Sequence, residues 1–454
     1  MTSRLTRREL LKVALLGTGA LMLASCAPKA PTKAPVAKAT VPEAKAAPVE
    51  LSVWMFSLTP EIIDYINDKV ISEFKEQYPE ATVSFEHIPY DGYRQKLTTG
   101  TVGGGLPDLH EAGTQAAGRV ATSGEGLPID DYIDGWDDKD DYFAPNWQGT
   151  QFGGYTWGVP IYSSPSLLLY WKSLFEEAGL DPEKPPVYET EYLEYANKLQ
   201  KVEGGKIIQL GGWSPAEWKG FFQAFEVELQ RLGGKMADED YQKVLFNSSE
   251  GEAALAWIVE LFETVYPEGV ARLPDEAPIP HFANRNIAMH MRGHGTECRD
   301  VKNYNPDVWD DLGFAPCLEA KEGIGRKVGI AWRNFISVAP TSVDPAAAAE
   351  LAHVFTGPVH NVAYTEFRGD VPVRRSSTDS DYVKNSDHVG KYLEMASPYG
   401  YDVVNPAGYF ELRQKGGDFF EAAALGKISM KEALEECAKV WEEQLAKEPP
   451  IKVP

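Results

Sequence analysis

The stretch that decides the fold class is LSVWMFSLTPEIIDYINDKVISEFKEQYPEATVSFEHIPYDGYRQKLTTGTVGGGLPDLHEAG, residues 51–113. Residues 51–56 and 81–88 alternate between apolar and polar side chains, as strands do, and 103–113 returns to a short strand followed by a loop. Between the first two strands, apolar residues recur every four positions along one face of a helix: Ile62, Ile66, Val70 and Phe74. This βαβαβ order predicts an α/β fold, with a mostly parallel sheet covered by helices and a ligand site at the carboxyl ends of the strands.

Residues 1–25 are expected to be a signal peptide. Arg7 and Arg8 precede an apolar run that is shorter than the ~20 residues of a membrane-spanning helix, and paired arginines indicate the twin-arginine route. The sequence Leu-Ala-Ser-Cys that follows resembles a bacterial lipobox, in which Cys26 is acylated and becomes the new N-terminus. The alternative is an ordinary cleaved signal peptide with an incidental cysteine.

Residues 26–50 are expected to be a lipid-anchored linker. They consist almost entirely of Ala, Pro, Lys, Thr and Val without an apolar face, a composition typical of an extended, semi-rigid spacer. No later segment is long and apolar enough to span a bilayer. The rest of the chain is therefore expected to be a soluble body, anchored by lipid at the outer side of the cytoplasmic membrane and thus periplasmic or extracellular.

Composition limits the partners that this body can have. The 454 residues are 43% hydrophobic, and about 400 of them follow the linker, which favours two domains. The net charge is −23; residues 1–25 hold four basic residues and one acidic residue, so the remainder carries −26. Such acidity argues against nucleic acid or anionic lipid as the main partner. It also disfavours a polyanionic ligand, unless a local basic pocket overrides it.

Three cysteines follow Cys26. Cys437 falls on one helical face with Leu434 and Trp441, and we interpret it as a core residue. Cys298 and Cys317 flank a short stretch and could form a disulfide outside the cytoplasm, although the sequence alone leaves their pairing open.

The rest of the chain continues to alternate between strands and helices. Residues 158–171 form two extended segments broken by Ser-Ser-Pro, and 328–340 is again strand-like. Four helices are predicted between these strands: 172–179, 188–202, 215–232 and 249–265.

Five segments in order resemble one protein family. They are ISEFKEQYPEATVSFEHIPYDGYRQKLTTGTVGGGLPDL (71–109), GVPIYSSPSLLLYWKSLFEEAGLDPEKPP (158–186), GIAWRNFISVAPTSVDPAAAAELAHVFTGP (329–358), GDVPVRR (369–375) and ALGKISMKEALEECAKVWEEQL (424–445). Behind a lipobox, they resemble the extracellular solute-binding proteins of ABC importers, specifically the sugar-binding family 1. Two departures stand out: Tyr170-Trp171-Lys172 occurs where the family commonly has Tyr-Asn-Lys, and 292–317 is a poorer match.

The resemblance implies a two-lobed clamp of the type II periplasmic-binding-protein class, each lobe a mostly parallel sheet flanked by helices, joined by a hinge. Lobe one would comprise 51–160 and 329–371, and lobe two 161–328 and 372–454. It implies a monomer that captures a carbohydrate, by its acidity a neutral mono- or oligosaccharide, and delivers it to a membrane permease with a cytoplasmic ATPase. The alternatives are the same clamp for a peptide, polyamine or phosphorylated polyol, or a secreted glycosidase.

A sugar site needs flat aromatic rings for apolar C–H faces and planar polar groups for hydroxyls. We expect such groups in loops at strand ends, with Trp213 and Trp332 foremost because small residues flank them. The candidate ligand-binding residues are Trp54, Ser57, Asp108, Glu111, Trp157, Tyr162, Trp213, Trp332, Arg333, Asn334 and Tyr409.

Catalytic and metal motifs are weak or absent. The sequence contains no nucleophile elbow, no HExxH and no Walker motif, so neither an enzyme nor a cofactor is predicted. Residues 130–141 partly match an EF-hand loop, but Tyr132 occupies a ligand position and the last residue is not Glu, which favours an acidic surface loop. His290 and His294 lie four apart among glycines, and no metal site is predicted there.

Overall fold

The computed structural model describes residues 48–56, 58–113, 116–216, 220–238, 243–274, 277–323, 327–396, 406 and 408–447. Ala46–Pro454 is one compact unit. The predicted signal peptide, the acylated Cys26, most of the linker and Ser57 lie outside the described residues.

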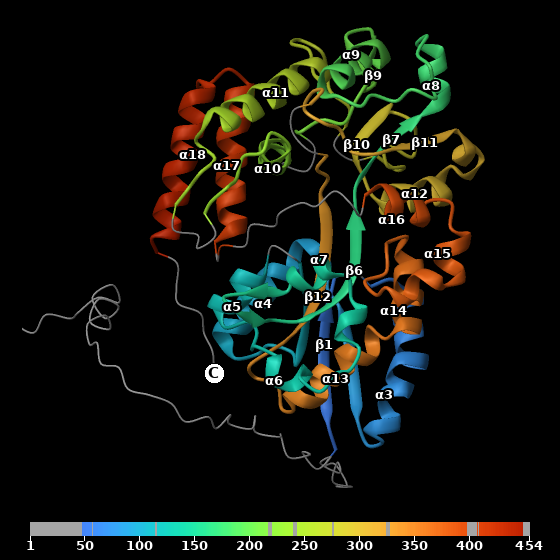
Figure 1. Ribbon diagram of the computed structural model, residues 1–454, viewed down its shortest axis with the longest axis vertical. Helices are drawn as coiled ribbons and strands as arrows, with labels where there is room; N and C mark the ends of the chain where they lie inside the picture. Colours follow the sequence, from blue (N-terminus) through green and yellow to red (C-terminus); the bar gives the residue numbers. More distant parts are fainter. Residues whose placement is uncertain are drawn as a thin grey trace, which may run out of the picture. The chain divides into compact units, whose positions relative to one another are not determined.

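A five-stranded sheet forms the first lobe. Its strand order is β2-β1-β3-β12-β6. The strands are β1 (Glu50–Met55), β2 (Thr82–His87), β3 (Leu109–Gly113), β6 (Val159–Pro165) and β12 (Ala331–Val338). β1 pairs in parallel with β2 and β3, whereas β12 runs antiparallel to β3 and β6. The parallel βαβαβ start is therefore confirmed, but with two parallel and two antiparallel pairings the sheet is mixed and not mostly parallel. Figure 1 shows β12 and β6 side by side.

Helices bury the apolar side of this sheet. The predicted stripe of Ile62, Ile66, Val70 and Phe74 is at most 1% exposed, which confirms it. It runs through α2 (Pro60–Tyr65), a π-helical turn (Ile66–Val70) and α3 (Ile71–Gln77). The other elements of this part are α4 (Tyr90–Gly103), α5 (Ala117–Ser123), α6 (Asp130–Ile133), α7 (Ala144–Gln148), α13 (Pro345–Phe355) and α14 (Pro358–Arg368), with the short strands β4 (Gln151–Phe152) and β5 (Tyr155–Thr156).

The second lobe has a three-stranded sheet that corrects one prediction. Its order is β10 (Met289–Gly293), β7 (Leu167–Trp171), β11 (Leu312–Ala315), and both outer strands pair antiparallel with β7. A mostly parallel sheet was wrong for this lobe. β10 and β11 run in the same direction, but the fully buried β7 lies between them, so neither has a parallel neighbour within this sheet.

The four helices predicted between residues 172 and 265 are confirmed, with altered ends, as α8 (Lys172–Glu177), α9 (Glu189–Leu199), α10 (Phe221–Arg231) and α11 (Ser249–Val265). The second lobe also contains α12 (Gly295–Tyr304), α15 (Asp381–Asn385), α16 (Val389–Met395), α17 (Tyr409–Ala424) and α18 (Met430–Leu445), beside the hairpin β8 (Lys201–Glu203) and β9 (Lys206–Gln209). α17 packs against α10, α11 and α18, as Figure 1 shows. Cys437, Leu434 and Trp441 are buried in this core as predicted.

The chain passes between the two sheets beside a short bridge. β6 and β7 are separated by Ser166 alone, and Ser163 exchanges backbone hydrogen bonds with Val371 at 3.0 and 2.8 Å. Since β6 stays in the first sheet to Pro165, we propose that the first crossing lies at Ser166 rather than at residue 160. The remaining lobe boundaries stay predictions.

Two buried arginines tie distant segments together. Arg231 donates to Glu189 at 3.0 Å and to Glu228 at 2.6 Å, and also to the carbonyl of Val328. Arg374, in the GDVPVRR segment, donates to Asp138 at 2.6 Å and to the Tyr142 hydroxyl at 2.7 Å. A buried charge without such partners costs several kcal/mol, about 3–5 on removal of one partner, so these networks fix where the segments meet.

The possible Cys298–Cys317 disulfide is not present. Both residues are buried free thiols in different surroundings. Cys298 lies 3.8 Å from the Tyr392 hydroxyl in the second-lobe core, whereas Cys317 donates to the carbonyl of Ser166 at 3.2 Å. Burial raises the pKa of both thiols, which keeps them protonated and unreactive.

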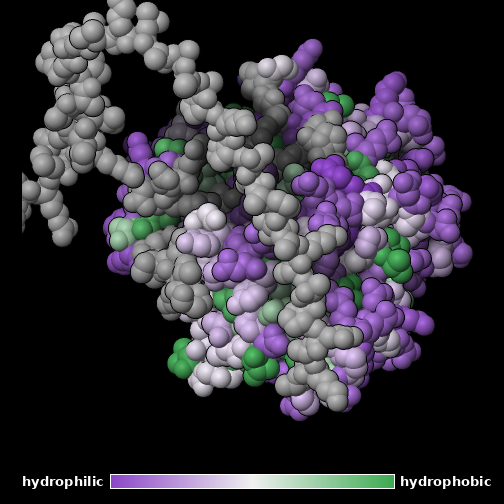
Figure 2. Space-filling view, turned by 60° about the horizontal axis from the view of Figure 1, so that its bottom comes forward, coloured by the Kyte–Doolittle hydropathy of each residue, from purple (hydrophilic) through white to green (hydrophobic). Residues whose placement is uncertain are grey.

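The coloured part of one face of the molecule is mainly polar. Figure 2 shows hydrophilic side chains over most of the visible face, with hydrophobic residues scattered singly among them. None of the helices in the described ranges combines the length and the hydrophobicity that crossing a bilayer requires.

His353 lies in a charged cluster of the first lobe. Its Nε2 is 2.9 Å from Asp138, its Nδ1 is 3.7 Å from Glu350, and its ring stacks on Trp136 at 3.9 Å. Burial lowers the pKa of His353, but hydrogen bonds and charges from Glu350 and Asp138 outweigh it, so the pKa lies above its ordinary 6.5. A raised pKa means that protonation stabilises the folded protein.

Replacing His353 with Gln should therefore remove stability that is present at low pH. The difference in unfolding free energy between the wild type and H353Q should be largest at roughly pH 6, below the pKa of histidine in the unfolded chain. It should shrink as the pH rises through the higher pKa that His353 has in the folded protein. Denaturant unfolding at several pH values measures it, with exposed His87→Gln as the control. A difference that grows with pH would contradict this assignment.

Candidate functional site

A cavity of about 250 Å³ lies where the strands of the first sheet end, and we call it the strand-end cavity. It receives side chains from β3, β6, β12, α4, α5 and the segment after β1, and also from α17 of the second lobe. Its lining residues are Phe56, Tyr90, Tyr93, Arg94, Glu111, Ala112, Gly113, Ala116, Arg119, Tyr162, Trp332, Asn334, Phe410 and Arg413. Six of these are aromatic, an arrangement suited to a ligand with apolar faces and polar edges.

Glu111 fixes the polar wall of the cavity. Its side chain is fully buried, and one carboxylate oxygen accepts the Phe56 backbone N–H at 3.1 Å. The other oxygen accepts the Asn334 amide at 2.7 Å. The register of β3 against β12, which pairs Gly113 with Asn334, brings these groups together. The carboxylate is thereby held in one position at the junction of three strands.

Tyr93 holds the aromatic side of the cavity. Its hydroxyl faces the backbone carbonyls of Trp54 and Glu111, at 3.0 and 2.8 Å. Burial, and then the charge of Glu111, raise the pKa of Tyr93 well above its ordinary 10, so the hydroxyl keeps its proton and donates. Phe56 packs edge-on against Tyr93 and Tyr90, with ring centroids 4.9 and 5.3 Å apart. These three rings are therefore positioned before any ligand arrives.

Tyr162 and Trp332 line the cavity from β6 and β12. Tyr162 lies opposite Asn334 in the strand pair, and the guanidinium of Arg368 lies 3.8 Å from the centre of its ring. Trp332, the residue two positions before Asn334, stays partly exposed beside His294, with ring centroids 6.3 Å apart. Its partial exposure leaves ring surface available to a ligand.

Arg94 connects the cavity to α17. Its guanidinium lies 4.0 Å from the centre of the Phe410 ring and 3.4 Å from the carboxylate of Glu411. Burial is the main reason that the pKa of Arg94 is lowered, and the like charge of Arg119 lowers it further. Two guanidinium groups thus share one side of this cavity.

Four of the eleven candidate residues line this cavity: Glu111, Tyr162, Trp332 and Asn334. Trp54 lines a separate cavity of about 680 Å³ on α4, where the ammonium of Lys96 lies 4.2 Å from its ring. Arg333 points to a third cavity of about 220 Å³ beside Ser166. Trp332 and Arg333 therefore line different cavities, because successive side chains along a strand point to opposite faces of the sheet.

Asp108 lies elsewhere than predicted. It precedes β3 instead of following it, so it is at the opposite end of the strand from the cavity. One carboxylate oxygen accepts from the backbone and hydroxyl of Ser52 at 2.8 and 2.9 Å, and the other accepts from Ser342 and Val343. Asp108 therefore joins two strand ends, and we assign it a structural role.

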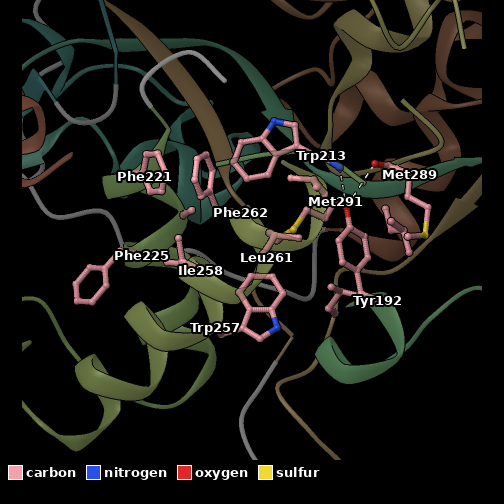
Figure 3. Packing of buried hydrophobic residues seen from close by; sticks show 14 of the residues in the cluster. Tyr192, Trp213, Phe221, Phe225, Trp257, Ile258, Leu261, Phe262, Met289 and Met291 are labelled. Carbon is pink, nitrogen blue, oxygen red and sulfur yellow. Dashed lines mark hydrogen bonds between the residues drawn. The ribbon is translucent and has the colours of Figure 1, made fainter. Parts of the chain in front are cut away.

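Three predicted aromatic residues belong to the cores. Trp157 is fully buried and donates to the carbonyl of Phe152 at 3.0 Å. Tyr409 is fully buried and donates to Glu226 at 2.6 Å. Trp213 is 3% exposed, and Figure 3 shows it packed among Phe262 and Met291, with its backbone N–H bonded to Tyr192 at 2.9 Å.

Sequence reasoning missed most of the helical contributors. On α4, Tyr90, Tyr93 and Arg94 follow one another at spacings that share one helix face, and this pattern was a usable signal. Phe410 adjoins the predicted Tyr409, but successive helix residues point about 100° apart, so burial of Tyr409 turns Phe410 toward the cavity. Arg413 shares the face of Phe410 at the i+3 position.

The acidic segment 130–141 is occupied by protein partners. Asp138 pairs with Arg374 and His353, Asp141 accepts from Ser376, and Asp130 accepts the backbone N–H of Thr156 at 2.9 Å. Burial is the main cause that lowers the pKa of both His290 and His294 to about 3, which keeps both rings neutral. No group of three potential metal ligands occurs among the residues with assigned structure.

Comparison with known proteins gives a family and a fold. The family model of the bacterial extracellular solute-binding proteins matches residues 59–361. The mannitol-binding protein of Pseudomonas aeruginosa is 27% identical over 385 residues, which are 80% of this chain and 86% of that protein.

Two solved structures are similar over nearly their whole length. An ABC transporter solute-binding protein of Thermotoga lettingae bound with α-D-tagatose has a TM-score of 0.72 at 23% identity, covering 87% of this chain and 100% of that chain. The sugar-binding protein MalE of Xanthomonas citri has a TM-score of 0.71 at 20% identity, covering 88% and 98%. At these identities the likeness shows the fold, the two-lobed type II clamp.

Truncation of Trp213 should reveal its structural role. Trp213→Ala should lower the unfolding free energy by about 3–5 kcal/mol, because it empties part of a closed core. Trp332→Ala, at a partly exposed ring, should cost about 1 kcal/mol or less. Denaturant unfolding of the two variants without added ligand measures both losses, and equal losses would contradict the assignment of Trp213 to the core.

Proposed function

Because this chain belongs to the family of bacterial extracellular solute-binding proteins, we propose that it is the substrate-binding subunit of an ABC importer. In this proposal it captures a small carbohydrate in the strand-end cavity and delivers it to a membrane permease that a cytoplasmic ATPase drives. Acylation at Cys26 would hold the protein, as a monomer, at the outer side of the cytoplasmic membrane. The protein itself would catalyse no reaction.

The observation that carries this proposal is the composition of the cavity. Six aromatic rings surround a fixed carboxylate, an amide and guanidinium groups, the combination that binds both the apolar C–H faces and the hydroxyls of a sugar. A volume of about 250 Å³ lies just below the roughly 300–1,000 Å³ of typical ligand pockets, which favours a mono- or disaccharide over a longer chain.

Contributions from both lobes support a clamp mechanism. Arg94 of the first lobe contacts Phe410 and Glu411 of the second. A ligand that touches both walls favours the closed arrangement over an open one, because it gains contacts only there. Closure would then present a ligand-dependent surface to the permease.

A panel of ligands tests the proposal. Thermal melts of the protein should shift with one class of sugar or polyol, since a ligand at a hundredfold its Kd adds about 2.7 kcal/mol to stability. The ligand should be recovered intact, as expected of a binding protein. A shift with peptides or polyamines but with no sugar would reject carbohydrate as the cargo, and hydrolysis of the sugar would indicate a glycosidase.

Removal of the Trp332 ring should weaken binding of whichever sugar shifts the melt. Trp332→Ala should raise the Kd at least tenfold, about 1.4 kcal/mol, because the partly exposed ring offers a stacking face. Trp309→Ala is the matched control, since Trp309 is also half-buried but donates to Asp387 in the second lobe, away from the cavity. Titration calorimetry gives both values, and an unchanged Kd in W332A would reject this site.

A further inference from the structure

The charges that line the strand-end cavity are unlike those of the whole chain. The sequence has a net charge of −23, yet the described residues that line the cavity include three arginines and a single carboxylate. The arginines are Arg94, Arg119 and Arg413. Three guanidinium groups at one ligand cavity offer hydrogen-bond donors that suit a negatively charged group of a ligand.

The three arginines of the cavity differ in their ion pairs. Arg119 is paired with Glu125, and Arg94 with Glu411, whose carboxylate is 65% exposed and so screened by water. Arg413 has no ion pair within the part of the chain that the structure describes. Glu111 accepts from the Phe56 N–H and the Asn334 amide, and its charge also acts on the buried Arg368.

Two further observations on Arg119 and Arg94 favour an anionic ligand beside them. The Nε of Arg119 is buried and has no hydrogen-bond partner among the described residues. Burial and the proximity of Arg119 lower the pKa of Arg94, a sign that the two guanidinium groups repel each other. An anionic ligand in the cavity would supply acceptors for the unused N–H donors and relieve this repulsion.

We propose that the ligand is an acidic sugar, a monosaccharide or disaccharide with a carboxylate, held with its ring on the aromatic walls and its carboxylate among Arg94, Arg119 and Arg413. This inference rests on the proposed function and narrows its substrate class. It replaces the neutral sugar expected from the whole-chain charge, because the charge of the lining residues decides which ligand is bound.

A carboxylate fits this cavity better than a phosphate does. The planar guanidinium matches the two oxygens of a carboxylate in a bidentate pair. A phosphate monoester carries up to two charges, and its approach through the field of a strongly acidic protein is less favourable. The small volume also leaves little room for a phosphate beside a sugar ring.

Matched pairs of ligands test the proposal on the full-length protein. Calorimetry would compare glucose with glucuronate, galactose with galacturonate and mannose with mannuronate, with glucose 6-phosphate as the phosphate arm. One acid should bind at least tenfold more tightly than its neutral partner, about 1.4 kcal/mol at 25 °C. Arg413→Gln should abolish most of this preference. Lys415→Gln, which removes an exposed positive charge from the same helix, should retain it.

Each other outcome has a distinct meaning. Equal or tighter binding of a neutral sugar would overturn the acidic-sugar inference and leave the carbohydrate-binding function standing. Tighter binding of glucose 6-phosphate would overturn the carboxylate in favour of a phosphate. An acid preference that survives in R413Q and is lost in K415Q would overturn the assignment of the site. If a neutral sugar or polyol shifted the thermal melt but no acid in this panel bound, the inference alone would fail. If neither this panel nor the thermal-melt panel contained a bound sugar, the proposed function would fail as well.

Discussion

The buried carboxylate of Glu111 is the constraint on which the site depends. It lies on the central strand of the first sheet and accepts from the chain after β1 on one side and from Asn334 of β12 on the other. A buried carboxylate is costly unless it is hydrogen-bonded, so these three strand ends are held in one arrangement. Phe56 is positioned directly, because its backbone N–H is one of the donors to Glu111. Trp332 lies two residues before the other donor, Asn334, on the same strand.

Much of the fold could be predicted from local patterns. The stripe from Ile62 to Phe74 and the strands beside it have clear periods, and these periods specify a parallel start of the first sheet. The antiparallel second sheet could not be predicted in this way. In this sheet β7 lies between β10 and β11, which follow it by more than a hundred residues. The local pattern of apolar residues does not indicate which distant strands pair, or in which direction.

The strand-end cavity was predictable in part, where it is built from strand ends. Glu111, Tyr162, Trp332 and Asn334 were selected because side chains at the ends of neighbouring strands meet at one edge. The contribution of α17 was missed because it depends on contacts such as that between Arg94 and Glu411, 317 residues apart. Trp157 and Tyr409 were predicted as ligand-binding residues but are buried in the cores. An aromatic residue near a loop can be a core residue, and the sequence does not distinguish the two roles.

The charge of the whole chain differs from the charges of the described residues that line this cavity. The chain as a whole is acidic, whereas three arginines are among the described residues that line the cavity. Charge near a ligand acts through short distances and low dielectric, so it outweighs distant surface charge that water and salt screen.

A crystal structure of the protein with a bound sugar tests the central claim most directly. The account predicts electron density for the sugar in the strand-end cavity, in contact with Trp332 and Phe410 and within hydrogen-bond reach of the polar groups around Glu111. Density at the cavity beside Trp54, or at the cavity lined by Arg333, with the strand-end cavity empty, would contradict it.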